Sequence, residues 1–180
     1  KNIKIWDLDM NSCLETLTGN NNSVTFVEFS PDGKQLASGD WNKINLWDME
    51  IRSCTQTLSG HKKKVLSVQF SPNSKQLVSG SQDHTIKLWD IKTGSCLQTL
   101  KGHTDVVFSV CFCIDGHSII SGSKDLTIKS WACDERSGQY TLEWERSAFK
   151  SNLIMEDVCI KDVSGLTTVV GGDEWKKILI

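Results

Sequence analysis

The chain of 180 residues has little proline, a single tyrosine and no dominant charge. Its 2 Pro and 13 Gly exclude a collagen-like or low-complexity chain. Its 20 Lys and Arg against 22 Asp and Glu leave a net charge of −2, so it lacks the long-range attraction to phosphate of a strongly basic domain. Nucleic acid is therefore not an expected partner. No apolar run approaches the roughly 18 residues that span a bilayer, so no membrane partner is expected either.

An export signal is also absent, because no basic stretch leads into an apolar segment after Lys1. The start at a residue other than Met indicates a segment of a longer protein. Seven cysteines are an odd number, and no Cys-x-x-Cys pair occurs, which favours an intracellular chain, cytoplasmic or nuclear, with reduced thiols. Cys111 and Cys113 lie two apart, but two thiols without further Cys or His nearby do not form a tetrahedral zinc site. We predict no metal and no cofactor.

The most informative feature is an internal repeat with a fixed period. Four tryptophans, the first three followed by Asp, recur every 41 or 42 residues: Trp6, Trp47, Trp89 and Trp131. Gly19, Gly60 and Gly102 recur in step, with His after the second and third. A Ser-Cys pair also recurs, at residues 12–13, 53–54 and 95–96, which favours a packing role for these cysteines. A constant period of this length is typical of repeat architectures.

Each period contains four short segments with strand character. Between residues 60 and 101, Leu66, Val68 and Phe70 place apolar side chains two apart, and the turn-forming run 71–74 follows. Further strands are expected near 76–79, 85–89 and 96–100. Four strands of about five residues suit an antiparallel meander and leave no room for a crossover helix. The sequence therefore predicts an all-β fold.

The unit from Gly60-His61, through Ser79-Gly80-Ser81 and Asp83, to Trp89-Asp90 resembles a WD40 repeat. Residues 102–131 resemble one nearly as well. A lone Trp-Asp pair is weak evidence, whereas the phased set at a constant period is specific. The resemblance implies a β-propeller, in which four-stranded antiparallel blades stack radially around a channel.

The repeats predict a partial, open arc of a larger propeller. Residues 1–18 hold the end of a first repeat, full repeats span 19–59, 60–101 and 102–143, and 144–180 hold an insertion and a degenerate fifth repeat. The expected strands begin and end on the third strand of a blade, so the arc does not close. We expect flanking sequence to supply the missing blades.

Each of the two best repeats contains His, Ser and Asp, the residue types of a hydrolase triad. An active site has no reason to recur in each blade, and no Gly-x-Ser-x-Gly elbow is present, so a hydrolase at His61, Ser79 and Asp83 is the weaker hypothesis. The resemblance implies instead a structural network in which Trp donates to Ser, Ser to His and His to Asp. Its members are His61, Ser79, Asp83 and Trp89, then His103, Ser121, Asp125 and Trp131. No catalytic residue is predicted.

The first full repeat departs from this pattern. Asn20 replaces the His, the loop between Ser38 and Trp47 is one residue shorter, and Trp41 stands six residues before the Trp, where Asp83 stands in its own repeat. The network is expected to lose both ends here. Either this blade is simply weaker, or Trp41 lies uncovered as an aromatic anchor, a residue type enriched at interface hot spots.

In the WD40 family, partners dock on the face that bears the loop before the first strand and the loop between the second and third. By position, the candidate partner-binding residues are Trp41, Lys62, Lys63, Lys64, Gln82 and Lys124. Lys62–Lys64 is the one compact basic run; such runs are usually just solvated, although this one could meet an acidic peptide or phosphate.

The leading hypothesis is a non-catalytic scaffold that presents propeller loops to a protein or peptide. The alternative is a regulatory or sensor arm of a multidomain protein whose catalytic or nucleotide-binding domain lies outside this segment. The identity of the partner does not follow from the fold.

Overall fold

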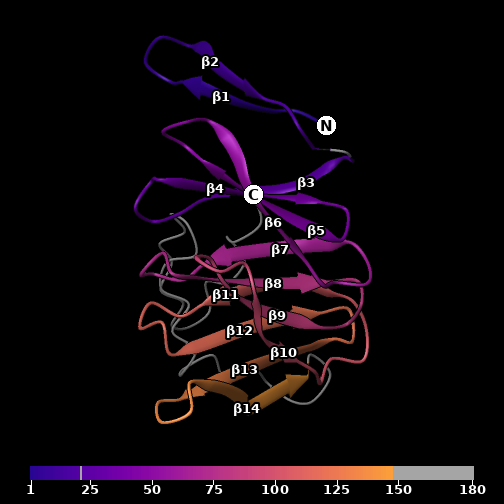
Figure 1. The fold of residues 1–180 in the computed structure, drawn as a ribbon. Coiled ribbons are helices and arrows are strands. Elements are labelled where there is room, and N and C mark those ends of the chain that lie inside the picture. The colour runs from indigo at the N-terminus through magenta and orange to yellow at the C-terminus, as the bar shows by residue number, and fades with distance from the viewer. Residues whose placement is uncertain (21, 148–180) are drawn as a thin grey trace, which may run out of the picture.

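In a computed structural model that describes residues 1–20 and 22–147, the chain forms strands and no helix (Figure 1). This part of the chain therefore holds no helix that could cross a membrane. The all-β prediction is confirmed. The strands are β1 (Ile3–Asp7), β2 (Ser12–Leu17), β3 (Val24–Phe29), β4 (Gln35–Asp40), β5 (Lys43–Asp48), β6 (Ser53–Ser59), β7 (Val65–Phe70), β8 (Gln76–Ser81), β9 (Ile86–Asp90), β10 (Cys96–Leu100), β11 (Val107–Phe112), β12 (Ser118–Ser123), β13 (Thr127–Asp134) and β14 (Gln139–Ser147).

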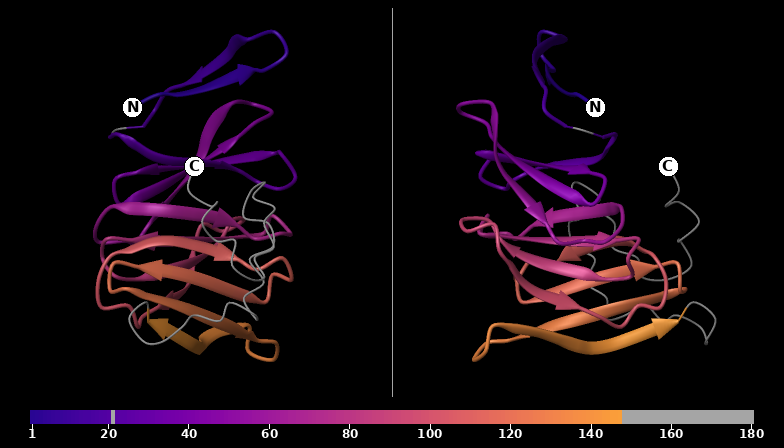
Figure 2. Two further views of the ribbon diagram at one scale, coloured as in Figure 1. Left: turned by 180° about the vertical axis from the view of Figure 1, so that it is seen from behind. Right: turned by 45° about the vertical axis from the view of Figure 1, so that its right-hand side comes forward.

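The strands form antiparallel meanders in chain order. A two-stranded sheet of β1 and β2 is followed by three four-stranded sheets, β3–β6, β7–β10 and β11–β14. These sheets stack face to face, with β1–β2 at one end and β11–β14 at the other (Figures 1 and 2). Because the described strands do not close on themselves, they form an open arc of propeller blades.

In two of the four-stranded sheets, a polar turn built around a serine joins the first two strands. In the turn between β7 and β8, the Ser71 hydroxyl donates to Asn73 Oδ1 at 2.8 Å, and the Gln76 amide donates to Ser71 Oγ at 2.9 Å. The equivalent turn between β3 and β4 repeats these bonds from Ser30 to Asp32 and from Gln35 to Ser30. A serine that satisfies the turn's own polar groups therefore sets the spacing of the first two strands.

The core lies between neighbouring blades. Ile86 and Leu88 of one sheet pack against Val107, Val110 and Trp131 of the next. Gly80 makes this approach possible, since a Cβ there would lie 2.8 Å from Val107 Cγ1. Ile128 occupies the same repeat position as Ile86 but is 40% exposed, against 1% for Ile86, because no described strand covers the last sheet.

Side-chain amides tie the blades together at both edges of the stack. Gln69 Oε1 on β7 accepts the Phe112 amide of β11 at 2.6 Å. On the outer strands, Gln98 donates to the Tyr140 carbonyl at 2.7 Å and accepts its amide at 2.8 Å. Each bond joins residues about one repeat apart. The repeat period therefore determines how neighbouring blades align, in addition to the strands within each blade.

The structure corrects the packing role predicted for the repeated cysteines. Cys13, Cys54 and Cys96 are exposed. Each lies on the outermost strand of its sheet, opposite the repeat Trp and beside a shift in strand register. Its Sγ donates to the backbone carbonyl two residues on, at 3.4–3.5 Å. Position at the rim, which the period alone does not reveal, keeps these thiols out of the core.

The last sheet also differs from expectation in length. The third full repeat was predicted to end at residue 143, but β14 continues to Ser147 and pairs along the whole of β13. The segment 144–180, predicted to hold an insertion and a degenerate fifth repeat, therefore begins within a strand. From residue 148 onward it lies outside the described residues.

Candidate protein-binding face

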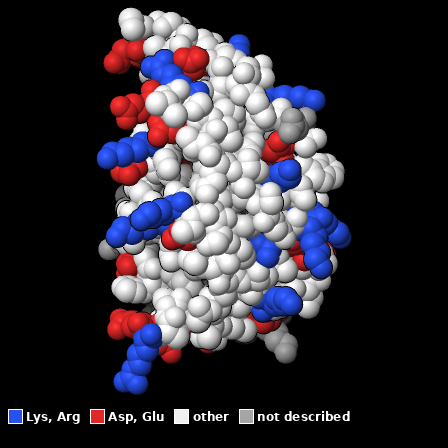
Figure 3. Space-filling model, in the orientation of Figure 1, with Lys and Arg blue, Asp and Glu red and all other residues white. Residues whose placement is uncertain are grey.

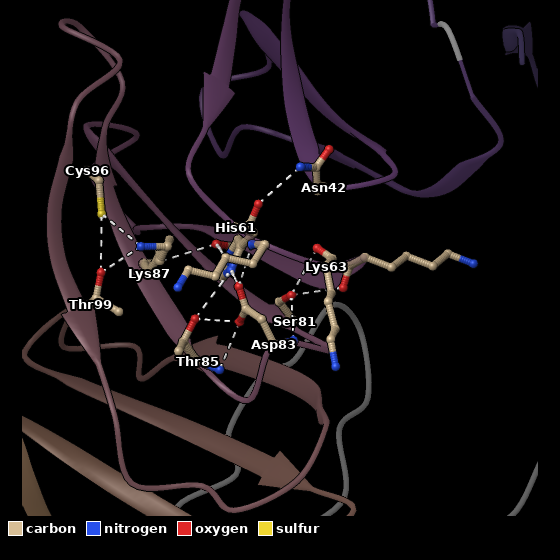
Figure 4. Close-up of polar contacts among 12 residues, drawn as sticks. Asn42, His61, Lys63, Ser81, Asp83, Thr85, Lys87, Cys96 and Thr99 are labelled. Carbon is tan, nitrogen blue, oxygen red and sulfur yellow. Dashed lines mark hydrogen bonds and ion pairs between the residues drawn. The ribbon is translucent and has the colours of Figure 1, made fainter.

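A chain of hydrogen bonds connects four predicted network residues in the β7–β10 blade. Trp89 Nε1 donates to Ser79 Oγ at 2.8 Å, and Ser79 Oγ lies 2.7 Å from His61 Nε2. The other ring nitrogen, Nδ1, lies 2.9 Å from Asp83 Oδ2. The network thus ties β8 and β9 to the loop before β7 and to the β8–β9 loop. Figure 4 shows its outer part, where His61 faces Asp83.

The charge of Asp83 sets the direction of these bonds. Burial opposes its ionisation, but hydrogen bonds from His61, the Thr85 side chain and the Lys62 amide outweigh burial and hold the pKa of Asp83 well below its usual range. As an anion, the carboxylate can only accept, so His61 donates through Nδ1. Its Nε2 is then left to accept from the Ser79 hydroxyl.

The β11–β14 blade repeats the network. Trp131 Nε1 donates to Ser121 Oγ at 2.9 Å, and His103 lies 2.8 Å from both Ser121 and Asp125. Burial opposes the charge of Asp125, yet bonds from Thr127, the Thr104 amide and His103 keep its pKa far below normal. Burial lowers the pKa of His103, with Asp125 acting against this effect. This histidine is therefore neutral near pH 7.

The order Ser–His–Asp is that of a nucleophile, a base and an orienting acid. In this structure, however, the Ser79 residue is 0% exposed, and its oxygen already accepts the Trp89 indole N–H. A substrate carbonyl has no route to that oxygen in this arrangement. The bonds join loops to strands and fix the shape of the blade instead.

The β3–β6 blade keeps more of the network than the sequence predicts. Trp47 donates to Ser38 Oγ at 2.8 Å, and Ser38 donates to Asn20 Oδ1 at 3.3 Å. Asn45 also donates to Asn20 Oδ1, at 2.9 Å. The expected loss is thus wrong at the His position, where Asn20 accepts in place of the histidine. At the other end, Asn20 Nδ2 is buried and has no hydrogen-bond partner in the described part of the chain.

Trp41 occupies a two-residue loop between β4 and β5. It has a φ of 59°, in the left-handed region, and is 55% exposed. Its carbonyl accepts the Val65 amide at 2.7 Å, and the neighbouring Asn42 Nδ2 donates to the His61 carbonyl at 3.1 Å (Figure 4). Both ends of the His61–Val65 loop therefore brace this hairpin, while the indole ring projects into solvent.

The three lysines lie on that same braced loop. Lys62 and Lys63 are exposed and Lys64 is half-buried. The loop's backbone is held by the Ser81 hydroxyl, which donates to the Lys64 carbonyl at 3.0 Å, and by the Gln82 amide, which donates to the same carbonyl at 2.9 Å. Basic side chains gather on the right-hand edge of Figure 3, at the level of β7 and β8 in Figure 1.

The remaining candidates lie at the same end of the sheets. Gln82 is half-buried in the β8–β9 loop. Lys124 is exposed, but its Nζ lies 3.7 Å from Asp105 Oδ2, and His84 Nε2 lies 3.9 Å from the other oxygen. The structure thus places all six candidates on one end of the stack. Sequence reasoning missed Asn42 and His84. It placed residues 104–106 on this face but assigned no role to Asp105, which stands one period after Lys63.

Stacked four-stranded sheets, each pinned by a buried tryptophan and serine, define a β-propeller segment built from sequence repeats. A family model for the WD domain, G-beta repeat (WD40) matches residues 11–48, 52–90 and 94–132. These segments cover more than half of the chain, which therefore belongs to the WD40 family. Each segment takes in the outer strand of one sheet and the first three strands of the next. Proteins of this family are typically non-catalytic and generally bind protein partners.

One relative among the curated proteins supports the same assignment. Over 38 residues the chain is 53% identical to "Nuclear distribution protein PAC1" of Mycosarcoma maydis. The aligned part is 21% of this chain and 8% of that protein. The likeness thus concerns about one repeat.

Proposed function

We propose that this chain is a non-catalytic protein-interaction module that binds a protein or peptide partner through its loop face. The loop face is the end of the stack that carries Trp41, Lys62–Lys64, Gln82 and Lys124. The exposed indole of Trp41, held on a braced hairpin, is the observation that carries the proposal. Burial of a large solvent-exposed aromatic ring against a partner contributes favourably to the free energy of binding.

The non-catalytic part of the proposal rests on the buried network. Both Ser-His-Asp sets occur at equivalent places in neighbouring blades, and both serines accept an indole N–H. A nucleophile needs an open path to substrate and a site for the developing oxyanion. Burial of Ser79 and Ser121 leaves neither in this arrangement.

A photo-crosslinking experiment tests which face binds. The two ends of β8 offer a matched pair of positions: Gln82 follows the strand on the loop face, and the exposed Lys75 precedes it at the opposite end. A benzoylphenylalanine residue is placed at either position, and cells that express the chain are irradiated. We expect protein adducts from position 82 and none above background from position 75. Adducts from position 75 alone, or equally from both, would contradict the proposal.

A further inference from the structure

Two junctions between blades on the loop face can be compared position by position. At the first, the β4–β5 hairpin meets the loop before β7, which carries Lys62–Lys64. At the second, the β8–β9 loop meets the loop before β11, which carries Asp105. Lys63 and Asp105 stand one period apart, so the same place holds opposite charges at the two junctions.

The second junction is balanced in charge. Asp105 lies 3.7 Å from the Lys124 ammonium, and His84 of the preceding blade approaches it from the other side at 3.9 Å. A protein partner with acidic residues would have to compete with Asp105 here.

The first junction is not balanced. Within residues 1–20 and 22–147, none of the Lys62, Lys63 and Lys64 ammonium groups forms an ion pair. The two nearby carboxyl groups are turned inward: Asp83 accepts the Lys62 amide, and Asp40, which is buried, accepts the Asn22 amide. Neither carboxyl group therefore neutralises the three lysines, whose loop is bonded to the hairpin that carries the exposed Trp41.

The β4–β5 hairpin, which carries the indole, is braced by hydrogen bonds to the next blade. The Trp41 carbonyl accepts the Val65 amide and the Asn42 side chain donates to the His61 carbonyl, so the hairpin and the lysine loop are held together before any partner arrives. Preorganised groups lose less conformational freedom on binding than flexible ones. The left-handed φ of Trp41, 59°, belongs to the loop rather than to the site, because His84 and Leu126, in the corresponding loops of the next two blades, both have a φ of 67°.

We infer that the first junction binds an acidic segment of a protein partner, with an apolar side chain against Trp41 and carboxylates against Lys62–Lys64. This inference rests on the proposed function and adds the chemistry of the partner. Unpaired ammonium groups attract carboxylates, and the large apolar face of an indole favours an aromatic or aliphatic neighbour. Nucleic acid fits less well, because the net charge is −2.

Fluorescence anisotropy with defined peptides tests the inference. The probe is a labelled peptide with two glutamates on each side of one phenylalanine, and its counterparts carry glutamine or lysine in place of glutamate. We expect the purified chain to bind the glutamate peptide most tightly, and more weakly as salt rises, because exposed charge pairs are screened. The lysine peptide should bind least.

Charge reversal locates the site. Lys63→Glu should weaken binding of the glutamate peptide roughly three- to tenfold, the range for exposed ion pairs exchanged for repulsion. Lys92→Glu is the matched control, since it makes the same change in net charge at an exposed residue beyond β9 at the opposite end of the sheets. Trp41→Gly should weaken binding about fivefold or more, as an interface anchor does.

Three results would overturn the inference. One is equal binding by the Lys63→Glu and Lys92→Glu variants, a second is no preference for glutamate over glutamine, and a third is tighter binding of a single-stranded oligouridine than of the peptide. If any of these occurs while position 82 still yields crosslinks, the loop face keeps its role and the assigned partner chemistry is wrong.

Discussion

The carbonyl oxygen of Trp41 and the amide of Val65 are joined by a hydrogen bond of 2.7 Å that crosses from one blade to the next. The hairpin that carries this exposed aromatic residue is thereby tied to the loop of Lys62–Lys64, whose ammonium groups form no ion pair within residues 1–20 and 22–147. The bond uses only backbone atoms of the two residues. Removal of the indole therefore leaves the bond's donor and acceptor in place, which makes binding and folding separable at this position.

Trp41→Gly should preserve stability. Glycine adopts the φ of 59° without strain, which offsets its greater freedom in the unfolded chain, so the free energy of unfolding should stay within about 1 kcal/mol of the native value. Trp41→Ala keeps the unfavourable φ and should be less stable than Trp41→Gly by about 1 kcal/mol. Urea denaturation of both variants measures the difference. Greater stability of the alanine variant would show that the hairpin is not strained.

Two equivalent glycines should respond differently to alanine. At Gly80 a Cβ would lie 2.8 Å from Val107 Cγ1 and 3.0 Å from Val110 Cγ1, so Gly80→Ala should cost about 1–2 kcal/mol through overpacking. Among the described residues, nothing lies within 4 Å of a Cβ placed at Gly122, and Gly122→Ala should leave stability unchanged or raise it by up to about 1 kcal/mol. Thermal melts distinguish the two. Equal shifts in Tm for the two variants would contradict the close packing of Gly80 against Val107 and Val110.

The serine networks should differ in strength between blades. Ser79→Ala leaves both the Trp89 indole N–H and His61 Nε2 without partners and should cost about 2–3 kcal/mol. Ser38→Ala deprives the Trp47 indole N–H of its acceptor, but Asn20 Oδ1 still accepts from Asn45, so the loss should be about 1–2 kcal/mol. Denaturant titration gives both values. A larger loss for Ser38→Ala would mean that Asn45 does not support Asn20.

Glu28 should make stability depend on pH. Burial raises its pKa from 4.5 to about 7, against a hydrogen bond from the Phe70 amide that lowers it. Because the folded state holds the proton more tightly, this group's contribution is fully present below about pH 4.5 and is lost as the pH rises through 7.

Glu28→Gln tests that dependence. Gln69, at the same repeat position, already bonds the next inner strand through its amide oxygen, so the substitution suits the site. The variant should gain about 1–2 kcal/mol at pH 8, after allowance for partial solvent screening, and nothing at pH 4. A gain of equal size at both pH values would exclude titration of Glu28 as the cause.

The period of the sequence predicted the blades and the network because each repeat contributes the same residues to the same bonds. For that reason, the sequence predicted the hydrogen bonds that connect Trp89, Ser79, His61 and Asp83. The hydrogen bonds that Asn20 accepts could not be predicted in this way, because one donor, Asn45, stands where the other repeats have lysine.

Surface features were harder to predict from the period. Cys96 and its counterparts repeat faithfully, yet their place on an outer strand exposes them. The contact between Lys124 and Asp105 depends on two loops that meet in space, and no spacing in the sequence indicates it. The direction of an exposed side chain depends on its neighbours rather than on its repeat position.

The most direct test of the binding face is the indole N–H spectrum of the ¹⁵N-labelled chain, which contains seven tryptophans. Trp47, Trp89 and Trp131 donate their N–H groups to buried serines, whereas Trp41 is exposed. The Trp41 signal is identified by its loss in Trp41→Gly. On titration with the glutamate–phenylalanine peptide, that signal should shift while the three buried signals stay in place. A Trp41 signal that does not move at saturating peptide would contradict the account.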